Sequence, residues 1–176
     1  MEVLDGISDK LIARHPHIYG DVKVNSEEDV KQNWEKLKLK EGKKSVLSGV
    51  PASLPALVKA IRLQEKSKQV GFEWKNAGEV WNKVEEESRE LEEAVESGDQ
   101  AHMEEEFGDL MFSMINYARF LRIDAETALE RTNLKFIQRF TKMEEAVALS
   151  GKQMTDLSLT ELDAIWNTVK KIKTAD

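Results

Sequence analysis

Apolar and polar positions along this chain recur with the period of an α-helix over most of its length. In one long segment Val80, Val84, Leu91 and Val95 are spaced by four or seven residues, which places them on one face of a helix. Alternating β-branched runs of the kind that indicate strands are missing from the sequence. The pattern therefore predicts an all-α protein.

Capping residues, glycines and prolines divide this pattern into separate helices. Asn76 followed by Glu79, and Ser158 followed by Glu161, have the spacing of N-terminal caps, and Asp124 precedes another apolar run. Residues 42–53 contain two glycines, a proline and three serines, which favours a flexible segment. We expect a bundle of four main helices with additions at both ends. The expected helices are residues 1–14, 26–42, 55–70, 76–97, 100–122, 125–149 and 159–173.

The helix expected at residues 100–122 carries a polar seam on an apolar background. Residues 107–121 are apolar on almost every side, which is typical of a buried helix. Asp109 lies in this stretch, and Ser113 and Asn116 follow it at i+4 and i+7. A buried acid is costly unless it is paired or bound to a metal ion. We therefore expect Asp109 to line a polar pocket.

Five carboxylates form two clusters on neighbouring helices, and a Gly-Asp turn separates the helices. Acids on one helix face repel, and unit charges about 4 Å apart interact by roughly 4 kcal/mol at intermediate dielectric. A hard divalent cation such as Mg²⁺ would turn that repulsion into binding. The alternative is a solvated acidic surface. The five acids are Glu86, Glu87, Glu90, Glu106 and Asp109.

Position relative to the apolar stripe separates these acids from their neighbours. Glu87 falls on the stripe and Glu90 on its edge, so both are expected to face the interior of the hairpin. Glu85 and Glu92 point elsewhere and are expected to be solvated.

Composition narrows the range of functions. The net charge of −7 argues against a nucleic-acid backbone or an anionic membrane as the main partner. The chain has no cysteine, which excludes disulfides, thiolate catalysis and cysteine-bound zinc. No signal peptide or long apolar run is evident, so we expect a cytoplasmic protein.

The string KVEEESRELEEAVESGDQAHMEEEFGDLMF resembles the signature of the MazG family of nucleoside triphosphate pyrophosphohydrolases. That signature is E-E-x-x-E followed, after a variable spacer, by E-x-x-D, and the five acids above match it. Residues 53–74 and 116–145 resemble the flanking segments of the family, and residues 1–20 resemble the end of a preceding MazG repeat. The expected division is a remnant at 1–20, a helix and flexible linker at 21–52, and a catalytic domain at 53–176.

The resemblance implies a role for each of nine residues in a four-helix-bundle-like MazG fold. Glu87, Glu90, Glu106 and Asp109 would bind Mg²⁺, and Glu86 would support them or polarise the attacking water. Lys83, Lys135, Arg139 and Trp166 would contact the nucleotide. Residue patterns alone leave alternatives open, because a basic line at helical spacing also suits an exposed salt-bridged face, and Trp166 also suits core packing.

The resemblance also implies an activity and an assembly. We expect Mg²⁺-dependent hydrolysis of nucleoside triphosphates to nucleoside monophosphate and pyrophosphate, with broad base specificity. A homodimer is expected, because a two-helix acidic hairpin cannot enclose a nucleotide alone. The alternatives are a non-catalytic helical module that binds nucleotides or proteins, and a hydrolase of guanosine alarmones.

Overall fold

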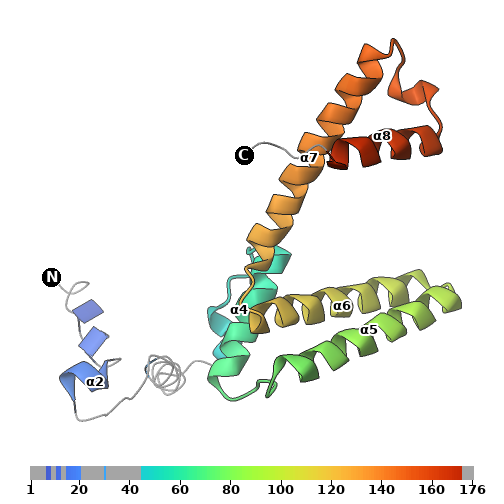
Figure 1. The fold of residues 1–176 in the computed structure, drawn as a ribbon. Coiled ribbons are helices and arrows are strands. Elements are labelled where there is room, and N and C mark those ends of the chain that lie inside the picture. The colour runs from blue at the N-terminus through green and yellow to red at the C-terminus, as the bar shows by residue number, and fades with distance from the viewer. Residues whose placement is uncertain (1–6, 9–10, 13–14, 21–29, 31–44, 172–176) are drawn as a thin grey trace. The chain divides into compact units, whose positions relative to one another are not determined.

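The computed structural model describes residues 7–8, 11–12, 15–20, 30 and 45–171. The helix expected at 26–42 lies almost wholly outside them. The described elements are all helical, without a strand among these residues, so the predicted all-α class is confirmed. By their contacts the residues form two units, Met1–Ile123 and Asp124–Asp176. Figure 1 shows the elements of each unit.

The first unit is built mainly from three helices that follow one another along the chain. Helix α4 (Ala56–Gln69) packs against both α6 (Gln100–Phe120) and the short 3-10 helix η1 (Val46–Gly49). The helix η1 lies within the segment predicted to be flexible. Helix α4 begins directly after Pro55 and is followed by Gly71 at φ 88°, in agreement with the predicted boundaries. The elements are α2 (Pro16–Tyr19), η1 (Val46–Gly49), α4 (Ala56–Gln69), α5 (Ala77–Ser97) and α6 (Gln100–Phe120).

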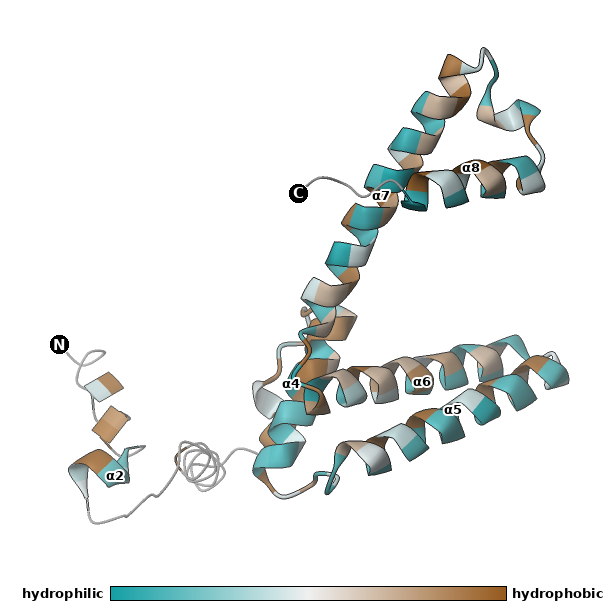
Figure 2. Cartoon of the chain, in the orientation of Figure 1, coloured by the Kyte–Doolittle hydropathy of each residue, from teal (hydrophilic) through white to brown (hydrophobic). Residues whose placement is uncertain are grey.

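Helices α5 and α6 form the predicted antiparallel hairpin. The Asn76 side chain accepts a hydrogen bond from the Glu79 backbone N–H and caps α5, as its sequence pattern predicts. Helix α5 ends at Gly98, whose φ of 72° lies in the left-handed region that glycine adopts without strain. Asp99 then caps α6 by accepting from the backbone N–H groups of Ala101 and His102. In Figure 2 polar and apolar residues alternate along α5.

The core of the first unit lies where α4, α5 and α6 meet, but α6 is less buried than its sequence suggests. Phe107, Met111 and Met114 are 54%, 44% and 46% exposed, and Asp109 is also exposed. The expectation of a helix buried on all sides is therefore wrong for the single chain. The physical reason is that α5 and α4 cover only part of its circumference. The buried apolar side chains are Ala60, Val80, Val84, Ala94 and Ile115.

The second unit is a pair of helices, α7 (Ala125–Leu149) and α8 (Leu159–Lys171), with the 3-10 helix η2 (Met154–Asp156) between them. Asp124 caps α7 through the Thr127 backbone N–H, as predicted. Met143, Val147 and Val169 are its buried residues. Across all the residues described, no helix is both long and apolar enough to cross a membrane.

Candidate metal and nucleotide site

Three of the four predicted metal ligands come together on the α5–α6 hairpin. Glu87, Glu106 and Asp109 each offer a carboxylate oxygen, and these oxygens all lie within 4.8 Å of one another. Oxygen ligands about 2.1 Å from a Mg²⁺ ion lie at most about 4.2 Å apart, so small side-chain rotations would suffice to bind one. Hard carboxylate oxygens are also the donors that Mg²⁺ prefers. The residues present therefore fit a divalent cation.

The packing of α5 positions Glu87 at the centre of this cluster. Its side chain is buried at 5% exposure, because it lies on the same face as Val80 and Val84. Glu106 and Asp109, three residues apart on α6, share one side of that helix. Core side chains of α5 thus lie beside Glu87, and the carboxylates of Glu106 and Asp109 on α6 lie close to it across the hairpin. This burial agrees with the prediction from the apolar stripe.

Lys83 lies one turn before Glu87 on α5 and connects two acids of the motif. Its Nζ lies 2.7 Å from Glu87 Oε1 and 2.9 Å from Glu86 Oε1. Hydrogen bonds to Glu87 and then to Glu86 raise the pKa of Lys83 above its usual value of 10.5, so the ammonium is charged at neutral pH. Glu86 is therefore turned towards Lys83, outside the group of three carboxylates.

Glu90, the fourth predicted ligand, is half-buried at the edge of the cluster and is not one of the three grouped carboxylates. Burial and the neighbouring Glu87 carboxylate raise the pKa of Glu90 above its usual 4.5, with a further contribution from Glu106. A raised pKa is expected for a carboxyl group that lies close to other carboxylates whose negative charge is only partly offset by cations. Glu85 and Glu92 are exposed, as predicted for solvated residues.

The cluster opens into a cavity of about 580 Å³ that lies entirely within the first unit. Lys83 and Glu87 of α5 and Asp109 of α6 line one part of it. Ser113 and Asn116, which follow Asp109 along α6, also line the cavity. The polar seam predicted along α6 is therefore the wall of a cavity. A volume of this size is within the range of small-molecule sites. The other lining residues are Leu47, Leu63, Gln64, Ser67, Gly71, Phe72, Glu73, Trp74, Val80, Phe112 and Arg119.

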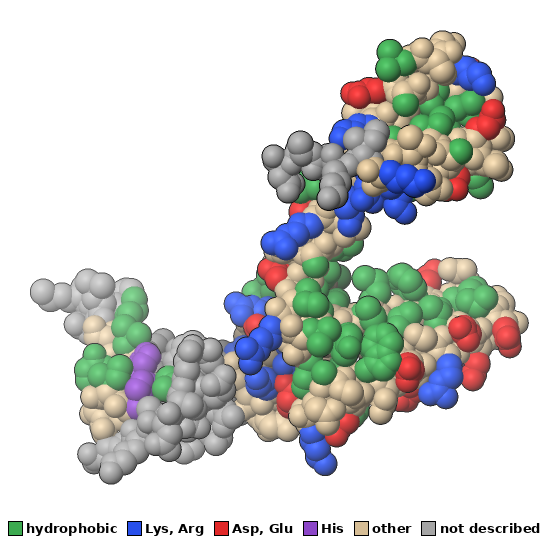
Figure 3. Space-filling view, in the orientation of Figure 1, with side chains coloured by type: hydrophobic (Ala, Val, Ile, Leu, Met, Phe, Trp, Pro, Cys, Tyr) green, Lys and Arg blue, Asp and Glu red, His purple; other side chains and the backbone are tan. Residues whose placement is uncertain are grey.

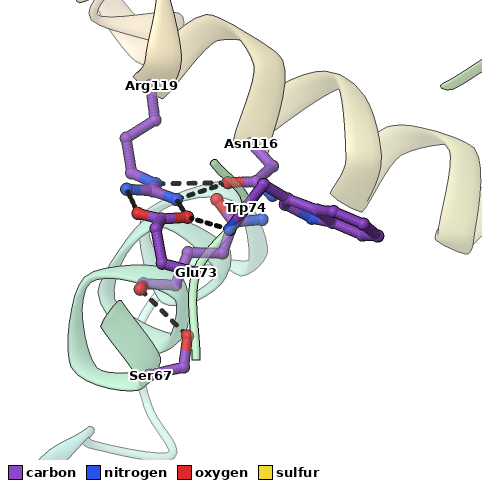
Figure 4. Close-up of polar contacts among 6 residues, drawn as sticks. Ser67, Glu73, Trp74, Asn116 and Arg119 are labelled. Carbon is purple, nitrogen blue, oxygen red and sulfur yellow. Dashed lines mark hydrogen bonds and ion pairs between the residues drawn. The ribbon is translucent and has the colours of Figure 1, made fainter. Parts of the chain in front are cut away.

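A second polar group lies in the same cavity, where Asn116 of the predicted seam meets Glu73 and Arg119, two residues that local sequence patterns did not single out. The Arg119 guanidinium binds both Glu73 carboxylate oxygens at 2.7 Å, and it also donates to Asn116 Oδ1. Figure 4 shows Arg119 facing Glu73 and Asn116, with Trp74 beside them. Glu73 and Arg119 are 46 residues apart in the sequence, so no local sequence pattern could have predicted that they pair.

Gln64 is the other residue that sequence reasoning missed. It is only 4% exposed and lines the cavity from α4. A signal for it did exist, because it follows the buried Ala60 by four residues and so interrupts an apolar helix face with an amide.

Three predicted nucleotide contacts belong to the second unit, so the first unit's cluster does not include them. Lys135 is exposed and Arg139 half-buried on α7, and neither forms an ion pair with a described residue. The Trp166 ring of α8 is half-buried, and its centroid lies 5.3 Å from that of Phe136. Trp166 therefore packs between the two helices and keeps part of its surface accessible. Contact of these residues with a substrate stays a prediction.

Comparison with known proteins places these residues in a family context. Residues 78–143 match the MazG nucleotide pyrophosphohydrolase domain. This span includes all five motif acids together with Lys83, Lys135 and Arg139, and it crosses the boundary between the two units.

Relatives are similar over nearly the whole chain. The nucleoside triphosphate pyrophosphohydrolase/pyrophosphatase MazG of Thermotoga maritima is 42% identical over 172 residues, covering 96% of this chain and 65% of the relative. The nucleoside triphosphate pyrophosphohydrolase of Escherichia coli is 39% identical over 176 residues, covering 97% of this chain and 67% of the relative. YabN of Bacillus subtilis, an uncharacterised protein, is 43% identical over 174 residues, which is 97% of this chain and 36% of that protein. The chain thus spans about two thirds of the length of the first two relatives, and it belongs to the MazG nucleotide pyrophosphohydrolase family.

Proposed function

We propose that this protein hydrolyses nucleoside triphosphates to nucleoside monophosphate and pyrophosphate with the aid of Mg²⁺. The observation on which this rests is the convergence of Glu87, Glu106 and Asp109 at one end of a cavity large enough for a nucleotide. The names of the Thermotoga maritima and Escherichia coli relatives support the same activity. Specificity for the base is expected to be broad.

The carboxylates would hold the cation, with Glu87, Glu106 and Asp109 as ligands and Glu90 joining from the edge of the cluster. A bound Mg²⁺ ion would polarise phosphate oxygens and lower the pKa of a coordinated water molecule. Glu86, which is half-exposed and within reach of Lys83, would support the ligands or orient the attacking water. Lys83 supplies positive charge next to the cluster through its contacts with Glu86 and Glu87, so its ammonium is suited to a phosphate oxygen.

Lys135, Arg139 and Trp166 are proposed as nucleotide contacts of the second unit. Lys135 and Arg139 are one helical turn apart and have no ion-pair partner among the described residues, so their charge is available to a triphosphate. The accessible part of Trp166 would flank the nucleoside. We retain the proposed division into a remnant at 1–20, a linker at 21–52 and a catalytic domain at 53–176.

The proposal is tested by incubating the protein with Mg²⁺ and a nucleotide panel and measuring pyrophosphate release. We expect Glu87→Gln and Asp109→Asn to lower the rate at least about a hundredfold, because a catalytic cation supplies several kcal/mol. Glu92→Gln is the matched control, since Glu92 lies on the same helix but outside the cluster. Chelation with EDTA should stop release, and excess Mg²⁺ should restore it.

The outcomes separate the three candidate functions. Unchanged turnover in both site variants would show that the wrong carboxylates were assigned. Binding of nucleotides without pyrophosphate release would favour the non-catalytic module instead. A marked preference for guanosine alarmones over ordinary triphosphates would favour the regulatory hydrolase.

A homodimer is proposed as the active assembly. Phe107, Met111 and Met114 follow one another at i, i+4 and i+7 on α6, so their exposed side chains form an apolar stripe. In Figure 3 hydrophobic side chains gather over the region where Figure 1 places α6. A second copy of the chain would cover this stripe and bury it between the two copies.

A further inference from the structure

The cavity extends beyond the acidic cluster to a part that carries no catalytic group. There Gln64, Trp74, Asn116 and Arg119 line it. The orientation of each polar side chain at this end can be worked out from its hydrogen-bond partners.

The Gln64 amide is oriented by a backbone carbonyl. Its Nε2 donates to Phe112 O at 2.9 Å, and because a carbonyl can only accept, the nitrogen must face Phe112. The Gln64 Oε1 is shielded from water and has no hydrogen-bond partner. A buried acceptor without a partner costs free energy unless some group provides a donor.

The Asn116 amide is oriented by Arg119. A guanidinium can only donate, and its Nη2 lies 2.7 Å from Asn116 Oδ1, so this oxygen is used. The Asn116 Nδ2 has no partner among the described residues and is the group that this side chain can offer. Arg119 is itself held by both oxygens of Glu73 at 2.7 Å. The two charges of that pair offset each other.

This end of the cavity therefore offers an acceptor from Gln64 and a donor from Asn116, with no uncompensated charge for a phosphate. Trp74 is 44% exposed and adds an aromatic surface to the cavity. Phe112 of α6 also lines the cavity. A planar ligand with an N–H next to an acceptor atom, bounded by aromatic rings, has the chemistry of a nucleobase. Ribose phosphate alone lacks both the planar aromatic ring and the N–H.

We propose that the part of the cavity lined by Gln64, Trp74 and Asn116 is the subsite for the nucleobase, with Gln64 Oε1 accepting from a base N–H. The inference rests on the proposed function, since it assigns the far end of the same cavity. Gln64 lines the cavity, and its oxygen, which has no partner in the ligand-free chain, would gain one from the base. All common bases carry an N–H next to an acceptor atom, so we expect the subsite to bind bases without selecting strongly among them.

The first experiment measures KM and kcat for the four common nucleoside triphosphates in Gln64→Met. We expect KM to rise about tenfold with kcat nearly unchanged, because the lost hydrogen bond serves binding rather than chemistry. Gln69→Met is the matched control, since Gln69 lies on the same helix, has an unpartnered buried Oε1 and does not line this cavity. Thermal unfolding of both variants confirms that they are folded.

The second experiment does not depend on hydrolysis. Without added metal, ¹⁵N-labelled protein is titrated with a nucleoside monophosphate, and the Trp74 indole signal, assigned with Trp74→Phe, is followed. We expect the monophosphate to shift the signal and ribose 5-phosphate to leave it in place. Asn116→Asp, which keeps the acceptor for Arg119 but replaces the donor, should weaken the shift.

The two experiments distinguish failure of the subsite from failure of the proposed function. Hydrolysis by the unaltered protein with equal KM in Gln64→Met and Gln69→Met would overturn the subsite alone, as would an equal shift by ribose 5-phosphate. A shift by the monophosphate that Asn116→Asp weakens, without any hydrolysis, would support the subsite and overturn the proposed function. Absence of both would overturn both.

Discussion

Lys83 and Asp109 show how differently two charged residues of one site are balanced. Lys83 forms ion pairs with Glu86 and Glu87, whereas Asp109 is close to Glu87 and Glu106 and forms no ion pair with a described residue. Lys83 thus offsets part of the charge on α5, while the acids of α6 repel one another. The convergence of these acids therefore costs some stability in the metal-free chain, and the proposed cation would offset that cost.

We predict that Asp109→Asn stabilises the metal-free protein by a few tenths of a kcal/mol, because it removes a like charge next to Glu106. With Mg²⁺ present the order should reverse, since the unaltered protein gains stability from the bound cation and the variant gains less. Thermal unfolding with EDTA and with Mg²⁺ measures both effects. An equal Mg²⁺ shift in the two proteins would contradict a cation site at Asp109.

A second prediction concerns the ion pair between Glu73 and Arg119, whose side chains are 21% and 17% exposed. We expect Arg119→Met to lower the free energy of unfolding by about 2–4 kcal/mol, because it leaves Glu73 partly buried without a partner. Arg62→Met is the control, since Arg62 pairs with Glu65 at the surface and should cost less than about 1 kcal/mol. Urea denaturation monitored by circular dichroism measures the free energy of unfolding of both variants. Similar decreases in the two variants would contradict a larger contribution from the Glu73–Arg119 pair.

At the scale of the elements, short capping sequences define the helices that form the site. Asn76 begins the helix that holds Glu87, and Asp99 begins the one that holds Glu106 and Asp109. Gly98 lets the chain reverse between them in two residues. The separation of the acids along the sequence is thus converted into proximity by a hairpin.

The cap of α7 makes a prediction about pH. Hydrogen bonds from the Thr127 backbone N–H and hydroxyl lower the pKa of Asp124 below its usual 3.8. A carboxylate with a lowered pKa stabilises the folded state above pH 3.8, and this stabilisation is lost as the pH falls through the folded-state pKa. Asp124→Asn keeps a capping oxygen without the titration, so its melting temperature should fall less between about pH 4 and pH 2 than that of the unaltered protein. Parallel curves for both proteins would contradict the role of the Asp124 charge.

At the scale of the whole molecule, the exposed apolar stripe on α6 is the feature that the single chain leaves unexplained. Monomeric proteins seldom expose large contiguous apolar patches, and the side chains of this stripe all lie on one face of α6. Burial of this stripe against a second copy of the chain is the physical reason for the proposed dimer.

We predict that Phe107→Asp converts the protein to a monomer and lowers pyrophosphate release, because a charge in the stripe opposes its burial. Leu149→Asp is the control, since Leu149 is 90% exposed on α7 and lies outside the stripe. Sedimentation velocity gives the mass of each protein. An unaltered chain that sediments as a 20.1 kDa monomer and still hydrolyses nucleotides would refute the dimer.

The sequence by itself determined the features that depend on neighbours along the chain. The ends of the helices followed from caps such as Asn76 and Asp124, because a cap is satisfied within three residues. The burial of Glu87 followed from its place on an apolar stripe of fixed helical period. Tertiary structure alone decided what depends on distant partners: the contact of Gln64 with Phe112, the pairing of Glu73 with Arg119, and the exposure of α6. No local pattern encodes these, because they depend on which helix faces lie opposite each other once the chain has folded.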